Sequence, residues 1–109
     1  MNINETSNMH IIADLVDKLK VNYNPDLVVL FGSRAGLNFD EDSDIDLLIV
    51  KNTKKRPLWR RIEVRKVLAT DKALDVVVYT PDEFTSLKKS RSTFIEEVLD
   101  KGIVLYERK

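Results

Sequence analysis

Two stretches of sequence decide the fold, VLFGSR at residues 29–34 and SDIDLLIV at residues 43–50. Each contains a continuous apolar run next to polar residues, which is typical of a buried strand with one exposed end. Gly32 closes the first run and permits a tight turn with a close backbone approach. Asp44 and Asp46 open the second run, and they point to the same face because side chains alternate along a strand. The sequence therefore predicts two strands joined by a loop, with a pair of carboxylates on one face.

The sequence outside these stretches predicts helices and two further strands. Apolar residues at helical spacing predict a first helix that ends near residues 22–25, and Pro57 is well placed to begin another that runs to about Thr70. That second helix is expected to bury three apolar residues, Leu58, Ile62 and Ala69. Further elements are expected as a strand at 74–79, a helix capped by Thr80, a helix at 92–101 and a closing strand at 103–106.

This order of elements indicates a mixed α/β (α+β) fold. We expect a small mixed sheet with helices packed mainly on one face. The chain shows no internal repeat and no linker rich in proline, glycine or serine, so we expect a single domain over residues 1–109.

The composition limits the possible functions but indicates no partner. Of the 109 residues 43% are apolar, and the 18 basic and 18 acidic residues cancel. The absence of cysteine excludes disulfides and cysteine-ligated metals, and a single histidine excludes a multi-histidine metal site. The first ten residues lack the apolar core of a signal peptide, and no apolar run could cross a bilayer. We therefore expect a cytoplasmic protein without a membrane partner.

The acidic pair indicates a metal site. Two carboxylates so close repel each other, and a hard divalent cation such as Mg²⁺ would relieve the repulsion while also binding substrate phosphates. Asp75 is the candidate third ligand, because a charge early in an apolar strand is costly to bury unless it is paired or bound to metal. Asp44, Asp46 and Asp75 could then hold two Mg²⁺ ions, one for the attacking oxygen and one for the leaving oxygen.

The Gly-Ser turn complements these acids as a candidate phosphate site. The Ser33 hydroxyl and the exposed N–H groups of a turn at Gly32 can hold phosphate oxygens, and Arg34 adds a positive charge for a triphosphate. Each motif alone has an ordinary structural explanation as a solvent-facing strand, a strand end or a turn. Only the combination favours nucleotidyl transfer.

The same combination resembles a known signature. Residues 31–33, a spacer of ten residues, residues 44–46 and later residues 74–76 resemble the motifs of the nucleotidyltransferase superfamily that includes DNA polymerase beta and kanamycin nucleotidyltransferase. The length and build of the chain are similar to those of the minimal nucleotidyltransferases, or MNT proteins. The resemblance covers nearly the whole chain and implies the polymerase beta-like fold.

The resemblance also implies roles for individual residues. In this family the Gly-Ser turn binds nucleotide phosphates, the first two acids bind the metals and the third acid also activates the attacking hydroxyl. By position, these roles fall on Gly32 and Ser33, on Asp44 and Asp46, and on Asp75.

One departure from the family pattern lies in the turn. MNT proteins often carry Gly-Ser-Arg-Ala-Arg-Gly, whereas residues 32–37 read Gly-Ser-Arg-Ala-Gly-Leu. Gly36 replaces the second arginine and Leu37 the last glycine, and the loss of a cation is expected to weaken triphosphate binding.

The family resemblance leads to a hypothesis about function. MNT proteins are typically paired with a HEPN-domain ribonuclease toxin, act as antitoxins, and in some cases transfer AMP from ATP to a tyrosine of the toxin. We therefore expect an ATP-using antitoxin in a hetero-oligomer with a HEPN toxin. Two alternatives stay open: a catalytically weak antitoxin that inhibits by binding alone, and a homodimeric nucleotidyltransferase acting on small molecules.

Other charged segments carry less weight. Residues 51–66 contain eight basic residues and one acid, which fits a solvated helix face better than a nucleic-acid surface; docking of an acidic partner or of the triphosphate is a third reading. The acids at 40–42 are expected to be solvated loop charges.

Overall fold

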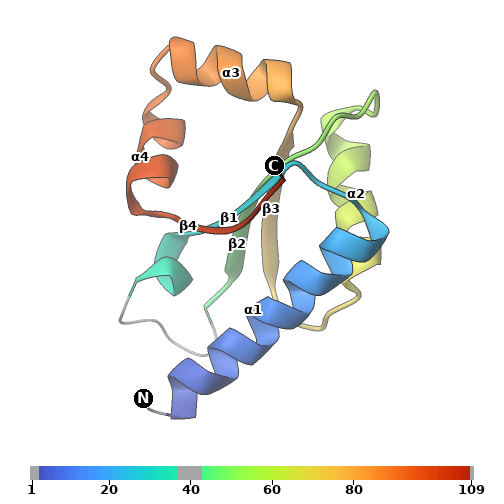
Figure 1. The fold of residues 1–109 in the computed structure, drawn as a ribbon, viewed down its shortest axis with the longest axis vertical. Coiled ribbons are helices and arrows are strands. Elements are labelled where there is room, and N and C mark those ends of the chain that lie inside the picture. The colour runs from blue at the N-terminus through green and yellow to red at the C-terminus, as the bar shows by residue number, and fades with distance from the viewer. Residues whose placement is uncertain (1–2, 37–42, 109) are drawn as a thin grey trace.

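The computed structural model describes residues 3–36 and 43–108, whose arrangement is shown in Figure 1. Within this part of the chain no helix is long and apolar enough to span a membrane. The elements follow one another as α1 (Ile3–Asn22), β1 (Leu27–Phe31), the 3₁₀ helix η1 (Gly32–Ala35), β2 (Ile45–Val50), α2 (Pro57–Leu68), β3 (Leu74–Tyr79), α3 (Pro81–Lys89), α4 (Thr93–Lys101) and β4 (Ile103–Glu107).

The strands form one mixed sheet in the order β3-β2-β1-β4. β1 pairs antiparallel with both β2 and β4, whereas β2 pairs parallel with β3. The register places Asp46 opposite Phe31 of β1 and opposite Asp75 of β3. The expected small mixed sheet is thus confirmed, and the two strands that flank the acidic loop are antiparallel neighbours.

Helices lie on both faces of this sheet (Figure 1). α1 and α2 bury Leu19 and Val64 against one face, and α3 and α4 bury Phe84 and Ile95 against the other. The expectation that helices pack mainly on one face needs this correction, because the central strands carry apolar side chains in both directions and both faces require a cover. Asp46 extends from the face on which α3 and α4 pack, because its neighbours Ile45 and Leu47 belong to the core on the α1–α2 side.

The buried stripe of α2 differs from the prediction. Leu58 is 54% exposed and Ala69 lies beyond the helix with a left-handed backbone, while Ile62 is half-buried. The residues buried instead are Arg60, Val64 and Leu68. They repeat every four positions and so form one continuous stripe toward the sheet, which includes a charged residue that apolar periodicity could not reveal.

Arginines of α2 hold the outer side of β3. Arg60 donates to the Val78 carbonyl at 3.1 Å, and Arg65 donates to the Leu74 carbonyl at 2.7 Å. Both carbonyls face away from β2, because carbonyls alternate in direction along a strand and those of Ala73 and Tyr79 accept from amides on the β2 side. These contacts satisfy main-chain acceptors that an outer strand would otherwise leave to water.

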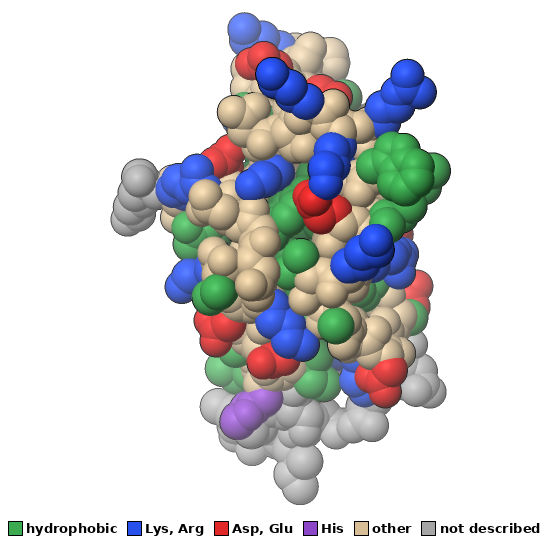
Figure 2. Space-filling view, turned by 90° about the vertical axis from the view of Figure 1, so that its right-hand side faces the viewer, with side chains coloured by type: hydrophobic (Ala, Val, Ile, Leu, Met, Phe, Trp, Pro, Cys, Tyr) green, Lys and Arg blue, Asp and Glu red, His purple; other side chains and the backbone are tan. Residues whose placement is uncertain are grey.

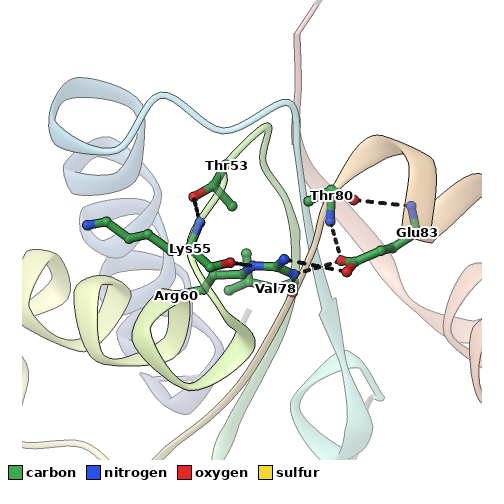
Figure 3. Close-up of polar contacts among 6 residues, drawn as sticks. All are labelled: Thr53, Lys55, Arg60, Val78, Thr80 and Glu83. Atoms are coloured by element: carbon green, nitrogen blue, oxygen red, sulfur yellow. Dashed lines mark hydrogen bonds and ion pairs between the residues drawn. The ribbon is translucent and has the colours of Figure 1, made fainter.

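The same Arg60 links α2 to the start of α3 (Figure 3). Its guanidinium pairs with Glu83 at 2.7 Å. Glu83 also accepts from the Thr80 amide, and the Thr80 hydroxyl accepts from the Glu83 amide. These two hydrogen bonds form a capping box around the Thr80 cap that the sequence predicts. One buried arginine therefore fixes where α3 begins over its face of the sheet.

Candidate active site

The turn after β1 is built around the missing side chain of Gly32. Gly32 has a φ of +72°, a conformation that favours glycine. A Cβ atom at this position would lie only 2.0 Å from the Oδ2 atom of Asp46. The carboxylate therefore lies directly against the backbone of the turn, in space that every other residue type would fill.

Asp46 is also the centre of the three predicted acids. Its register partner on β3 is Asp75, and parallel strands in register direct the two side chains to the same face. Burial, followed by the negative charges of Asp75 and Asp44, raises the pKa of the Asp46 carboxyl above its ordinary value. Asp46 is half-buried, whereas Asp44 and Asp75 are exposed to solvent. Asp44 and Asp75 are thus each close enough to repel Asp46.

This donor set fits a hard divalent cation. It consists of carboxylate oxygens, which Mg²⁺ prefers, and a cation would relieve the repulsion centred on Asp46. Across residues 3–36 and 43–108, no three acidic, histidine or cysteine side chains already surround one point closely enough to hold an ion. Mg²⁺ commonly retains several waters and takes substrate phosphates as ligands, so a complete protein cage is not required.

Ser33 and Arg34, both predicted to bind phosphate, differ in their exposure to solvent. Ser33 is exposed on η1. Arg34 is only 4% exposed, and its Nε atom donates to the Ser43 carbonyl at 2.9 Å. Arg34 also lines a cavity beside α1, together with Leu30, on the face opposite Asp46. Its contact with Ser43 anchors the chain immediately before Asp44, which is a different position from the expected one beside a triphosphate.

Part of the predicted turn lies outside the described residues. Leu37 and the acids at 40–42 belong to that part of the chain. Gly36, which stands where MNT proteins often carry arginine, is exposed, and its amide donates to the Ser33 carbonyl at 3.1 Å.

A cavity of about 440 Å³ adjoins the turn, between η1 and α4. Gly32 lines it and also lies against the Asp46 carboxylate, so the cavity and the acidic site share this residue as a neighbour. Its other wall is α4, which contributes Phe94, Glu97 and Lys101. The sequence indicates no role for these residues, because their nearness to Gly32 depends on β4 returning beside β1. The signal in the sequence that could have indicated this wall is an aromatic residue followed by two charged ones on the same predicted helix.

Half of the basic residues at 51–66 serve the fold itself. Lys51 donates to the Tyr23 carbonyl, Lys55 pairs with Glu63, and Arg60 and Arg65 bind carbonyls of β3. On the face that Figure 2 presents, basic side chains are spread among acidic and apolar ones. The observed contacts favour the interpretation of this stretch as a solvated and structurally used surface.

The chain is similar to known proteins both in sequence and in structure. The profile of the family described as "Polymerase beta, Nucleotidyltransferase" matches residues 13–109. A search of curated proteins found no match.

Solved structures with a similar fold include nucleotidyltransferases and toxin–antitoxin complexes. A protein of Sulfolobus solfataricus designated a candidate nucleotidyltransferase is 20% identical with a TM-score of 0.63, over 94% of this chain and 83% of that one. A toxin–antitoxin crystallised with AMP-PNP is 22% identical with a TM-score of 0.64. The match covers 89% of this chain and 73% of that one. The toxin–antitoxin MntA–HpeT with two Asp-to-Glu substitutions is 20% identical with a TM-score of 0.64, over the same shares.

At these low identities the solved structures support only the fold of this chain. Its membership of a family is supported by the family profile. The profile covers nearly the whole described chain, including the Gly32 turn and all three acids. This chain belongs to the polymerase beta nucleotidyltransferase family.

Proposed function

We propose that this chain transfers AMP from ATP to a tyrosine hydroxyl of a HEPN-domain toxin, in the presence of Mg²⁺, and so acts as an antitoxin in a hetero-oligomer. The observation that carries the proposal is the position of Asp46, which lies against the Gly32 turn and beside Asp75. This arrangement joins a candidate phosphate site to a candidate metal site. Toxin–antitoxin structures, one with AMP-PNP, are among the proteins of similar fold.

In this proposal the acids and the turn have separate tasks. Asp44, Asp46 and Asp75 would hold two Mg²⁺ ions, and these would stabilise charge on the triphosphate and on the attacking oxygen. The Gly32 and Ser33 backbone and the Ser33 hydroxyl bind the β and γ phosphates. Arg34, buried and bound to Ser43, positions the approach to Asp44.

The transfer step is an in-line displacement at the α phosphorus. A bond forms between the acceptor oxygen and the α phosphorus, and the bond from that phosphorus to the bridging oxygen of the β phosphate breaks. Pyrophosphate leaves, and Asp75 takes the proton of the acceptor hydroxyl. Most of the rate acceleration would come from positioning and charge stabilisation.

The test is transfer of label from α-labelled ATP to protein. Purified chain, lysate and Mg²⁺ are combined, and Asp44→Asn is compared with Asp82→Asn, which removes an exposed acid of α3. We expect one labelled protein band for the wild type and for Asp82→Asn and none for Asp44→Asn. Wild-type transfer by Asp44→Asn would contradict the proposal.

A second candidate function is a binding-only antitoxin. It is favoured by the burial of Arg34 and by Gly36, which leave the turn at 32–36 without an exposed cation. This candidate predicts partner binding that survives replacement of all three acids, with no labelled band. The homodimeric alternative predicts label on a small molecule in the absence of any lysate protein.

A further inference from the structure

The cavity between η1 and α4 has the features of a site for a planar ring. Its volume of about 440 Å³ falls within the range of small-molecule sites, which are mostly apolar with a few polar groups. The walls include the aromatic residues Phe31 and Phe94 and the charged residues Glu97 and Lys101.

The two phenylalanines form an aromatic corner. Their ring centroids lie 5.4 Å apart and the ring planes are at 85° to each other. A planar ring entering the cavity could therefore meet the face of one ring and the edge of the other, which are the two arrangements that aromatic groups prefer. Phe94 is still 39% exposed, so part of its surface is open to a ligand.

The position of the cavity relates it to the acids. Gly32 lines the cavity, and the Asp46 carboxylate lies against the backbone of the same residue. A ligand with phosphates at the turn and acids would have its other end within reach of α4. The cavity is thus placed for the part of a nucleotide that carries no phosphate.

We propose that Phe31 and Phe94, with Glu97 and Lys101 at the rim, form the nucleobase site of this nucleotidyltransferase. The inference rests on the proposed function, because it assumes that a nucleoside triphosphate binds at the turn. Phe94 supplies the stacking surface, and the charged pair on α4 faces the polar edge of the base. The Lys101 Nζ and Glu97 Oε1 atoms lie 3.7 Å apart, and both side chains are largely exposed. A base can therefore replace this ion pair at little cost in free energy.

Phe94→Leu is the decisive variant. Leucine keeps an apolar side chain against Phe31 but removes the ring, so the fold is retained. Leu99→Ala is the matched control, because Leu99 lies on the same helix with a similar exposure of 44% but does not line the cavity. Phe94→Tyr restores a ring at the same position.

The measurement compares two ligands in Mg²⁺ by calorimetry, ATP and inorganic tripolyphosphate, of which the second has no base. Loss of one base–aromatic stack should weaken ATP binding by Phe94→Leu by roughly tenfold. Tripolyphosphate binding should not change, and both Leu99→Ala and Phe94→Tyr should bind ATP like the wild type.

The outcomes separate the two proposals. If Phe94→Leu binds ATP as tightly as the wild type, or if it weakens ATP and tripolyphosphate equally, the base site is wrong while the proposed function stands. If the wild-type chain binds neither ligand, the proposed function fails and the base site with it.

Discussion

The Asp46 carboxylate occupies the space that a side chain at residue 32 would need. A Cβ on Gly32 would lie 2.0 Å from Asp46 Oδ2, and the φ of +72° adds strain for any other residue. The turn and the central acid are therefore one structural unit.

Gly32→Ala should damage both stability and activity. The strained backbone and the displaced carboxylate should lower the free energy of unfolding by about 1–3 kcal/mol. Transfer activity should fall to background, because Asp46 can no longer keep its position. Thermal unfolding and the label assay measure the two effects.

Gly36→Ala is the matched control for that variant. Its φ is negative, and its new Cβ would approach the Ser33 carbonyl to only 3.4 Å. It should unfold within about 0.5 kcal/mol of the wild type. Equal damage from both variants would show that the Gly32–Asp46 contact is not the cause.

Asp46→Asn should stabilise the chain in the absence of metal. The raised pKa of Asp46 means that its charged form disfavours the folded state above that pKa. The variant should therefore have the higher melting temperature at pH 7, and the difference should disappear as pH falls below the ordinary value of 3.8. Added Mg²⁺ should raise the melting temperature of the wild type more than that of the variant. A lower melting temperature for Asp46→Asn at pH 7 without metal would contradict the repulsion.

Arg34→Lys should distinguish positioning of the chain from contact with phosphate. Arg34 is buried and bound to Ser43, so its replacement should displace the start of β2 and lower kcat by roughly tenfold. The KM for ATP should change by less than about threefold. Steady-state kinetics supplies both values. A large rise in KM with an unchanged kcat would instead support the direct phosphate contact expected from the sequence.

Glu83→Gln should remove a contribution to stability that depends on pH. The hydrogen bond from Arg60, followed by that from the Thr80 backbone, lowers the pKa of Glu83. Ionised Glu83 therefore stabilises the fold fully above its ordinary pKa of 4.5, and this contribution is lost as pH falls through the lowered value. Because the side chain is 42% exposed, solvent screens the pair, and we expect a cost of about 1 kcal/mol at pH 7.

Denaturant unfolding from pH 7 down to pH 3 measures this effect. Glu96→Gln serves as the control, since Glu96 and its partner Arg91 are both largely exposed. A cost for Glu83→Gln that is independent of pH would contradict a charge-based role.

The strands and caps could be predicted because their signals are local. The bounds of β1 and β3 coincide with apolar runs closed by Gly32 and Thr80. The capping box of Thr80 and Glu83 was readable because its partners are three residues apart. The expected strand alternation of Asp44 and Asp46 needs a correction, because β2 begins at Ile45 and Asp44 lies just before it. Asp44 is nevertheless near enough to contribute to the raised pKa of Asp46, from which it is separated by one residue.

The remaining features depend on contacts between distant segments. Arg60 is buried because it reaches the outer edge of β3 and the start of α3, which apolar periodicity cannot indicate. Arg34 is buried, lines the cavity beside α1 and binds the Ser43 carbonyl, and none of these contacts is specified by the local sequence. Phe94 lies beside Gly32 only because β4 pairs with β1.

The arginines along β3 have a consequence for self-association. An outer strand with free main-chain groups can template the addition of another strand, and repeated addition leads to ribbons and aggregates. On β3, Arg60 and Arg65 already occupy two of the carbonyls that such an incoming strand would need. Two copies could join through β4, the other outer strand of the sheet. Each end of the combined sheet would then be a β3 strand whose outer carbonyls are bound by Arg60 and Arg65. Growth by strand addition would stop at a pair.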